Sequence, residues 1–382
     1  MYKKAKFLLA LLFCFIWLSA STAAESDFNF RWVLPPEYYR GNDFHDGRAW
    51  VQKEKDGPWT LFDTEGNVVK KNFMANNIQQ GYNADTRFEA IEKDGETGWK
   101  LYGFIDDHSG NILSEPKPYE LIPPFYLNGI GSKKGENGLW GHIDFQGNWV
   151  IPPVYEDFKP WGDGLVPAKK GGKWGYVNEK GEVVIDFHFR QIYPFRNGLA
   201  AASLDSLYGL IDRDGNWVTE AIYERFYYPM SNIIADQIAA QKDGKIGFLD
   251  ARGNVVIDFK FTGVNTMGGT ALGWVATFNE GRAIVPLSRE QEGRVIIYTL
   301  AVINESGDII PTRHDTFMTG YSNGFAVAVR GKKLFMLDRD GKEHSLPPVF
   351  QQDEVMIYQS DDGIFRVHFK KEDKTGYFKV GN

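Results

Sequence analysis

The chain is almost without cysteine. Cys14 is the single cysteine among 382 residues, and it lies in an apolar segment near the N-terminus. Without that segment the chain has no thiol, which excludes a disulfide framework and cysteine-based catalysis. A secreted chain of this size is then held together by its apolar core alone.

Positive charge is also in short supply. The chain has 43 lysines and arginines against 50 aspartates and glutamates, a net charge of −7. Removal of three N-terminal lysines with a leader segment makes the remainder about −10. Nucleic-acid binding requires a basic face, as does electrostatic docking on an anionic membrane. We therefore expect neither nucleic acid nor a membrane surface as a partner.

Catalytic and metal-binding motifs are absent as well. The chain has no His-Glu-x-x-His, no Gly-x-Ser-x-Gly and no P-loop. Its seven histidines lack metal-ligand spacing such as i, i+4. Asp212-Arg213-Asp214-Gly215 resembles the start of a calcium loop, but the distal glutamate is missing. We expect no catalytic residue, no metal and no cofactor, and hence not an enzyme.

The N-terminus has the features of a secretory signal peptide over residues 1–24. Lys3, Lys4 and Lys6 form a charged region, and residues 7–18 form an apolar core too short for a comfortable membrane span. Small residues at 21–24 allow cleavage after Ala23 or Ala24. The alternative is an uncleaved anchor. Residues 25–382 are expected to form one domain without a membrane span, in a periplasmic or extracellular protein.

One short pattern recurs along nearly the whole chain: two apolar runs around a polar corner that ends in glycine. An acidic or amide residue stands three positions before the glycine in most copies. Asx side chains bond the backbone in turns, and glycine tolerates a left-handed conformation. The pattern predicts a hairpin with a type I turn and glycine in the bulge position. The corner glycines are Gly66, Gly110, Gly147, Gly181, Gly215, Gly253, Gly307, Gly341 and Gly381.

Two companion motifs recur in step with the corners. One is aromatic-x-x-Gly-apolar-small, as in residues 195–200, and the other follows the corner, as in Ile151-Pro152-Pro153. Most corners are spaced by about 34 to 40 residues, a period typical of propellers and solenoids. The chain is therefore predicted to be all-β, built from about nine tandem hairpin units.

The repeated units resemble the WG (KWG) repeat family. Trp140-Gly141, Trp174-Gly175, Tyr208-Gly209, Ile246-Gly247 and Tyr102-Gly103 each lead into a corner, and the resemblance covers about residues 32–382. The copies near Trp59, Ile303 and Leu334 lack the glycine. The resemblance implies a bacterial β-repeat protein and no shared catalytic chemistry.

The strand that contains Trp174 and Tyr176 is apolar or small on both sides. We expect both faces to be covered, with Gly175 leaving room for the ring of a neighbouring unit. Aromatic residues make up 15% of the chain. Since most of them stand at equivalent repeat positions, we interpret them as core residues rather than ligand platforms.

The two ends of the array are out of phase. The chain stops just after a corner, and the strand that normally follows is found at the N-terminus, as Trp32-Val33-Leu34. Pairing of this strand with the last hairpin would close a propeller-like ring and remove exposed strand edges. Nine corners exceed the usual 4 to 8 blades, so an open superhelical β-solenoid is the alternative.

Two units carry extra residues, at 263–275 with 288–294 and at 76–86. Insertions in repeat arrays form loops on one side, often the binding side. Trp274 lies out of repeat register in such a stretch and is the candidate ligand-binding residue.

The sequence favours a secreted binding or scaffold protein that recognises another protein or an envelope polysaccharide. The alternative is a carbohydrate-active enzyme, such as a glycoside hydrolase, on the same scaffold. That activity needs two carboxylates roughly 5 to 9.5 Å apart, and repetition of turn acids prevents the sequence from nominating a pair.

Overall fold

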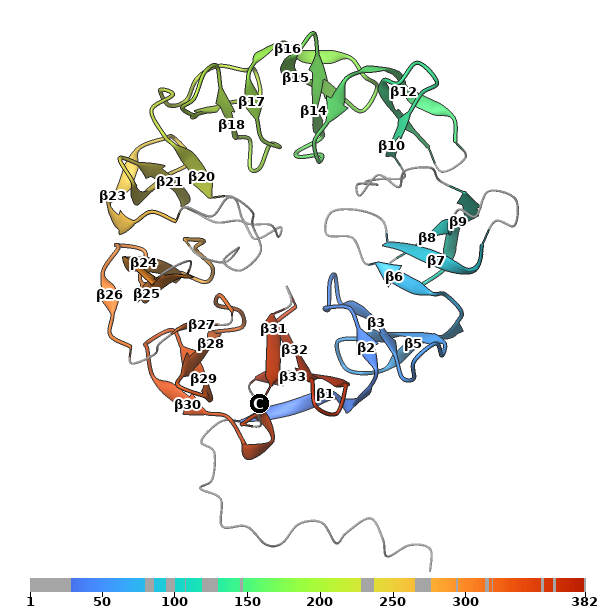
Figure 1. Cartoon of the computed structure of the whole chain (residues 1–382), viewed down its shortest axis with the longest axis vertical. Coiled ribbons are helices and arrows are strands. Elements are labelled where there is room, and N and C mark those ends of the chain that lie inside the picture. The colour runs from blue at the N-terminus through green and yellow to red at the C-terminus, as the bar shows by residue number, and fades with distance from the viewer. Residues whose placement is uncertain are drawn as a thin grey trace, which may run out of the picture.

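The protein is a ring-like succession of small antiparallel sheets (Figure 1). A computed structural model describes residues 29–79, 86–93, 100–106, 108–118, 130–144, 147–227, 237–264, 276–292, 295–312, 316–317, 319–351, 354–359 and 362–380. These residues form nine sheets and no α-helix. The expected all-β class and hairpin repeats are confirmed.

Each sheet holds three or four strands, which follow chain order except that the N-terminal strand lies beside the last strand of the chain in the last sheet. In sheets such as β20–β23 (residues 225–262) and β27–β30 (residues 316–345) the first strand lies nearer the centre of the ring than the last (Figure 1). The first four sheets after the N-terminal strand β1 (Phe30–Tyr38) are β2 (Arg40–Gly41), β3 (Arg48–Gln52), β4 (Trp59–Asp63) and β5 (Val68–Phe73); β6 (Asn77–Gln79), β7 (Thr86–Lys93), β8 (Lys100–Ile105) and β9 (Ile112–Pro118); β10 (Gly131–Lys134), β11 (Trp140–Ile143) and β12 (Trp149–Tyr155); and β13 (Asp157–Phe158), β14 (Leu165–Lys170), β15 (Lys173–Asn178) and β16 (Val183–Phe189).

The remaining five sheets complete the succession. They are β17 (Gln191–Ile192), β18 (Ala200–Ser203) and β19 (Gly209–Ile211); β20 (Arg225–Tyr227), β21 (Ile238–Lys242), β22 (Lys245–Leu249) and β23 (Val255–Thr262); β24 (Ala283–Glu292), β25 (Val295–Ile303) and β26 (Ile309–Ile310); β27 (Thr316–Phe317), β28 (Phe325–Arg330), β29 (Lys333–Asp338) and β30 (Glu343–Ser345), followed by the 3-10 turn η1 (Pro348–Phe350); and β31 (Val355–Gln359), β32 (Ile364–Phe369), β33 (Lys374–Val380) and β1.

The Asx-x-x-Gly corners connect the strand that carries the Trp-Gly position, or its equivalent, to the segment that follows it in the same sheet, such as β15 to β16. Their geometry is the expected one. At Asp212 the backbone carbonyl accepts a hydrogen bond from Gly215 N–H at 3.0 Å, and the Asp212 N–H donates to Asn216 at 2.9 Å. Gly215 has a φ of 85°. This is a type I turn with a left-handed glycine in the bulge position.

Corner side chains pair one acid with one amide. Asn216 donates its amide to Asp212 at 3.2 Å, and in the β13–β16 sheet the order is reversed, with Asn178 donating to Glu182 at 2.7 Å. The same pairing, in one order or the other, occurs in six corners: 63/67, 144/148, 178/182, 212/216, 250/254 and 304/308. Each pair ties the two ends of a corner together.

The apolar core lies between sheets rather than at one centre. The described residues form eight buried clusters, and each draws its members from two neighbouring sheets. Between β13–β16 and β17–β19, for example, Tyr176 packs on Phe195 with ring centroids 4.6 Å apart. The aromatic residues of the aromatic-x-x-Gly motif are buried, which confirms their interpretation as core: Phe44, Trp161, Phe195, Phe278 and Tyr321.

The corner glycine also makes the contact between successive sheets. A Cβ placed on Gly215 would lie 3.0 Å from the Ile185 side chain of the preceding sheet, and one on Gly307 would lie 2.6 Å from Ile257. Gly181 and Gly341 face Ile151 and Ile310 in the same way. The glycine therefore serves both the turn and the packing of one sheet on the next.

The glycine of the Trp-Gly motif faces a β-bulge, and here the expectation was wrong in part. The β15 strand is buried on both faces, as expected. A Cβ on Gly175, however, would lie 2.5 Å from the Ile185 carbonyl oxygen, which belongs to the bulged strand β16 of the same sheet. The space is taken by backbone because the bulge turns this carbonyl toward β15.

Other units place a ring at the equivalent point, but the ring belongs to the same sheet and not to a neighbouring unit. Trp149 covers Gly141, Trp217 covers Gly209 and Phe259 covers Gly247. In β29 the equivalent residue is Phe335, and the β29–β30 ladder there is regular. The Trp-Gly motif and the motif after the corner recur together. The glycine of the Trp-Gly motif leaves the space that the bulge in the strand after the corner occupies.

The N-terminal strand pairs with the last hairpin of the chain. Strand β1 runs antiparallel to β33, with Trp32 opposite Phe378 and Phe30 opposite Val380. Residues from the two ends of the described chain thus share one sheet, as the phase of the array predicted.

We expect Gly175→Val to destabilise the protein by about 3 kcal/mol or more, because the new side chain must displace a backbone carbonyl. Chemical denaturation of the purified chain measures the change. Thr60→Val is the matched control, because Thr60 stands at the equivalent position of another unit. Equal unfolding midpoints for the two variants would contradict the steric role of Gly175.

Candidate functional site

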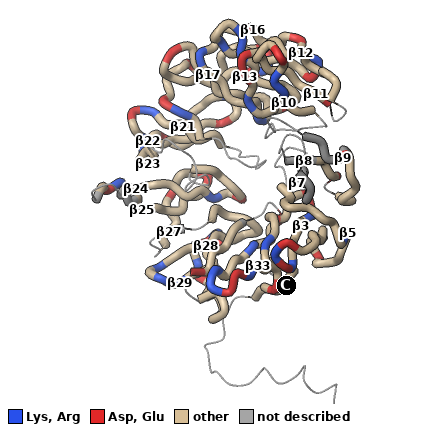
Figure 2. The backbone as a smooth tube through the Cα atoms, turned by 45° about the vertical axis from the view of Figure 1, so that its right-hand side comes forward, with Lys and Arg blue, Asp and Glu red and all other residues tan. Residues whose placement is uncertain are grey.

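The residue singled out from the sequence as a ligand contact, Trp274, lies outside the described residues. The same holds for most of the 263–275 insertion and for 80–85. The second part of the long unit, from Ser288, is not a loop. It lengthens β24 and β25 into a hairpin that projects from the ring (Figure 2).

The carboxylates of the corners are engaged in turn hydrogen bonds. Oδ1 of Asp212 accepts the N–H groups of Asp214 and Asn216 at 3.0 and 2.9 Å, and Oδ2 accepts the Asn216 amide. At Asp250 the side-chain hydrogen bond from Asn254, with backbone N–H groups, holds the pKa below its ordinary value. The calcium-like spacing at Asp212 is thus used as turn chemistry, as in the other corners.

The histidines of the described chain serve separate local roles. His344 Nε2 lies 2.9 Å from Asp338 Oδ2 in a corner where Lys342 replaces the usual amide. No group of three or more histidine, cysteine or acidic residues within the described residues has metal-binding geometry.

His142 is the exception among them, because it is buried without a polar partner. It is 1% exposed, both ring nitrogens lack a hydrogen bond, and its ring centroid lies 4.2 Å from that of Phe158. In other units the equivalent residue is a tyrosine: Tyr176 donates to the Tyr193 carbonyl at 2.6 Å, and Tyr377 donates to the Asn42 carbonyl at 2.7 Å. The shorter imidazole makes no such bond.

Burial lowers the pKa of His142 to about 3. Since the unfolded chain takes up this proton near pH 6.5, stability is full above pH 6.5 and is lost as the pH falls toward 3. We expect a loss of about 2 kcal/mol between pH 7 and pH 5 from this residue. His142→Tyr should abolish that loss and raise stability at pH 7, because the new hydroxyl can reach the Lys159 carbonyl.

Urea unfolding at pH 7 and pH 5 measures both effects. His142→Phe is the control, because it removes the titration without adding a hydroxyl and should lack the gain at pH 7. Equal acid sensitivity in the original chain and in His142→Phe would contradict the assignment.

The two ends of the sheets differ in charge. Because the strands are antiparallel, hairpins between second and third strands lie at the opposite end of a sheet from the corners. Neighbouring sheets share this orientation, because their aromatic-x-x-Gly turns contact each other. The Gly198 N–H donates to Asp163 in the turn of the preceding sheet at 2.8 Å. The Gly324 N–H donates in the same way to Glu280 at 2.6 Å. Corners therefore gather on one face of the ring and hairpins on the other.

The corner face is acidic. By sequence, the eight corners between residues 63 and 342 contain fourteen acidic residues and five basic ones. The basic ones are Lys180, Arg213, Arg252, Arg339 and Lys342.

The hairpin face is basic. Four hairpins, called here the lysine hairpins, comprise residues 170–173, 242–245, 330–333 and 370–374 and contain ten basic and three acidic residues. Three other hairpins are described. The one at 53–58 is balanced, with two basic and two acidic residues, and so is the one at 134–140, with Lys134 against Glu136. The one at 203–208 has Asp205 and no basic residue. Figure 2 marks acidic and basic positions along the backbone.

One sheet combines exposed aromatic surface with two lysines. Strand β10 ends in Lys133 and Lys134, whose ammonium groups each lie 5.8 Å from an indole ring, of Trp149 and Trp140 respectively. Trp149 is 42% exposed. We call these four residues the Trp-Lys platform. Sequence reasoning missed it because Trp149 stands in repeat register, where most aromatic residues are buried.

No helix long and apolar enough to cross a membrane occurs in the described part of the chain.

Comparison with protein families identifies the repeats. The model of the WG-containing repeat matches residues 28–55, 140–174, 174–208 and 208–232. These segments include Trp140, Trp174 and Tyr208, which begin three of the five motifs on which the resemblance was based, and they cover about a third of the chain. No curated protein sequence matches the chain.

Several solved structures are similar to this chain at low sequence identity. A eukaryotic initiation factor matches with a TM-score of 0.50 at 10% identity, over 81% of this chain and 87% of that one. Hsv2 from Kluyveromyces lactis has a TM-score of 0.34 at 9% identity, covering 91% and 98%. An inactive virginiamycin B lyase from Staphylococcus aureus has a TM-score of 0.30 at 12% identity, covering 94% and 100%. At these identities the likeness concerns the fold alone.

Proposed function

We propose that this chain, with its WG-containing repeats on a propeller-like array, is a closed ring that serves as a secreted binding or scaffold protein. Its ligand is another protein or an envelope polysaccharide, bound at one face of the ring. The observation that carries the proposal is the division of the ring into an acidic corner face and a basic hairpin face.

Closure is supported by contacts at the junction of the two chain ends. The Tyr377 hydroxyl of β33 donates to Asn42 in the first sheet, as Tyr176 does to Tyr193 at an internal junction. Gly47 N–H donates to Asp362 at 2.9 Å, as Gly198 N–H does to Asp163. Arg366 adds an ion pair with Asp43 at 2.6 Å. The junction thus repeats the contacts of other neighbours, which an open superhelical solenoid would lack.

A disulfide tests the closure directly, because the mature chain has no other cysteine. Arg31 and Lys379 are opposite in the β1–β33 pairing, so we expect Arg31→Cys with Lys379→Cys to form a cross-link. Closing so long a loop should stabilise the protein by up to about 5 kcal/mol. Thermal unfolding with and without reductant measures the gain, and a double variant that stays reduced under oxidising conditions would count against the ring.

The signal-like segment at residues 1–24 supports secretion to the periplasm or the exterior. Edman sequencing of the exported chain tests this, and the expected new N-terminus is Ala24 or Glu25. An intact Met1 would favour the uncleaved anchor.

Binding is tested with a screen of glycans and cell-envelope extracts on the purified mature chain, together with pull-down mass spectrometry. A specific saccharide or a single protein partner supports the proposal. Release of sugar from a bound glycan would replace it with a carbohydrate-active enzyme, and absence of every ligand would overturn it.

A further inference from the structure

We propose that the lysine hairpins bind an anionic polysaccharide that carries carboxylate or phosphate groups along its chain. This inference rests on the proposed binding function and adds the face and the ligand chemistry.

The lysine hairpins present charges that the protein leaves available. Lys170, Lys173, Lys332 and Lys333 are exposed, as are Lys370 and Lys371. In the described part of the chain, none of these six lysines is within salt-bridge distance of a carboxylate, whereas neighbouring Arg330 is paired with Glu343 at 2.9 Å. The first carboxylates of the corners, such as those of Asp212 and Asp250, by contrast accept hydrogen bonds within their turns. The available charge of the ring is therefore positive on the hairpin face, although the chain as a whole is acidic.

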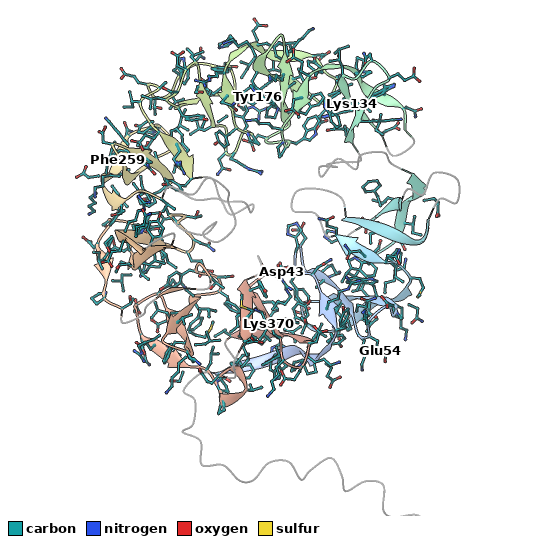
Figure 3. The ribbon with its side chains drawn as sticks, viewed as in Figure 1. Asp43, Glu54, Lys134, Tyr176, Phe259 and Lys370 are labelled. Carbon is teal, nitrogen blue, oxygen red and sulfur yellow. The ribbon has the colours of Figure 1, made fainter. Side chains whose placement is uncertain are left out.

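The arrangement of these charges suits a polymer rather than a small anion. Each hairpin holds two or three basic residues, and the hairpins belong to four different sheets. Figure 3 shows how far apart such positions lie, with Lys134 and Lys370 on widely separated sheets. A single small anion contacts one hairpin, whereas a chain with repeated charges can contact several, and the contacts then act together.

The composition of the hairpins favours a polysaccharide over a lipid surface. Their tips consist of glycine, lysine and acidic residues, such as Gly171-Gly172, Asp243-Gly244 and Glu372-Asp373. Surfaces that dock on bilayers combine basic residues with apolar or aromatic side chains that enter the interface. The acids would also repel a dense layer of anionic headgroups, while a chain with spaced charges can avoid them.

The Trp-Lys platform supplies the second element of saccharide recognition. The half-exposed indole of Trp149 offers a flat apolar surface for a sugar ring, and Lys133 beside it can contact an acidic substituent. Its two lysines stand at the hairpin end of β10, opposite Trp140 and Gly141 of β11. Trp149 starts β12 directly after the 144–148 corner, and its ring reaches back over Gly141. The platform therefore runs along the sheet from the corner side to the lysines of the hairpin end.

The test compares two sets of four charge removals by calorimetric titration with polygalacturonate at low salt. The hairpin set is Lys170→Gln, Lys173→Gln, Lys332→Gln and Lys333→Gln. The control set is Lys180→Gln, Arg252→Gln, Arg339→Gln and Lys342→Gln, which removes the same charge from the corner face. We expect the hairpin set to weaken binding at least tenfold and the control set less than twofold, with thermal unfolding unchanged in both. Binding should fall as salt is raised, and neutral dextran should not bind.

Three outcomes would overturn the inference. Equal weakening by the two sets would assign binding to net charge alone. Binding to vesicles of phosphatidylglycerol and phosphatidylcholine, without binding to polygalacturonate, would assign the face to a membrane. Failure to bind any polyanion, together with a neutral glycan or protein partner in the envelope screen, would remove this inference while leaving the binding function in place.

Discussion

The structure depends on the contact between one sheet and the next. A three- or four-stranded sheet of this size cannot bury both of its faces alone. The described clusters each lie between two neighbours, and the corner glycine packs on an isoleucine of the preceding sheet. Stability is therefore a sum of similar junctions, and a substitution at one junction is expected to act on two sheets.

The glycines of this chain act through two different physical requirements. The corner glycine needs a positive φ, as Gly215 shows, and contact space for a neighbouring isoleucine. The glycine after the tryptophan needs only space, because a bulged strand places backbone or a ring above it. Corner glycines are consequently retained in units that have lost the second kind, such as the β27–β30 sheet, where Phe335 faces a regular ladder.

A rigid frame made from repeated turns also explains how charge can be divided between two faces. The corner acids take part in the hydrogen bonds that form the turn, so the acidic face follows from folding requirements. The lysines of the hairpins are not the residues that form the turns, where glycine or aspartate adopts the positive φ. Their charge is thus available for recognition of a ligand on the surface of the ring.

Much of the local structure could be predicted from the sequence because it is set within a few residues. The Asx-x-x-Gly spacing determined the corners, and the acid-amide alternation at 178/182 and 212/216 was readable there, although only the structure drew attention to it. The phase of the array also predicted the β1–β33 pairing. These features depend on backbone conformation and on patterns that recur in the chain.

The tertiary structure alone decided the contacts between residues that are distant along the chain. The contact above Gly175, the orphan imidazole of His142 and the exposure of Trp149 depend on which strand bulges and which residue faces the next sheet. Equivalent repeat positions carry the same residue in different surroundings, as half-buried Trp140 and buried Trp174 show. By itself the sequence determined the repeat and its turns, because those interactions are local; burial and the charge of each face were decided by how the sheets pack.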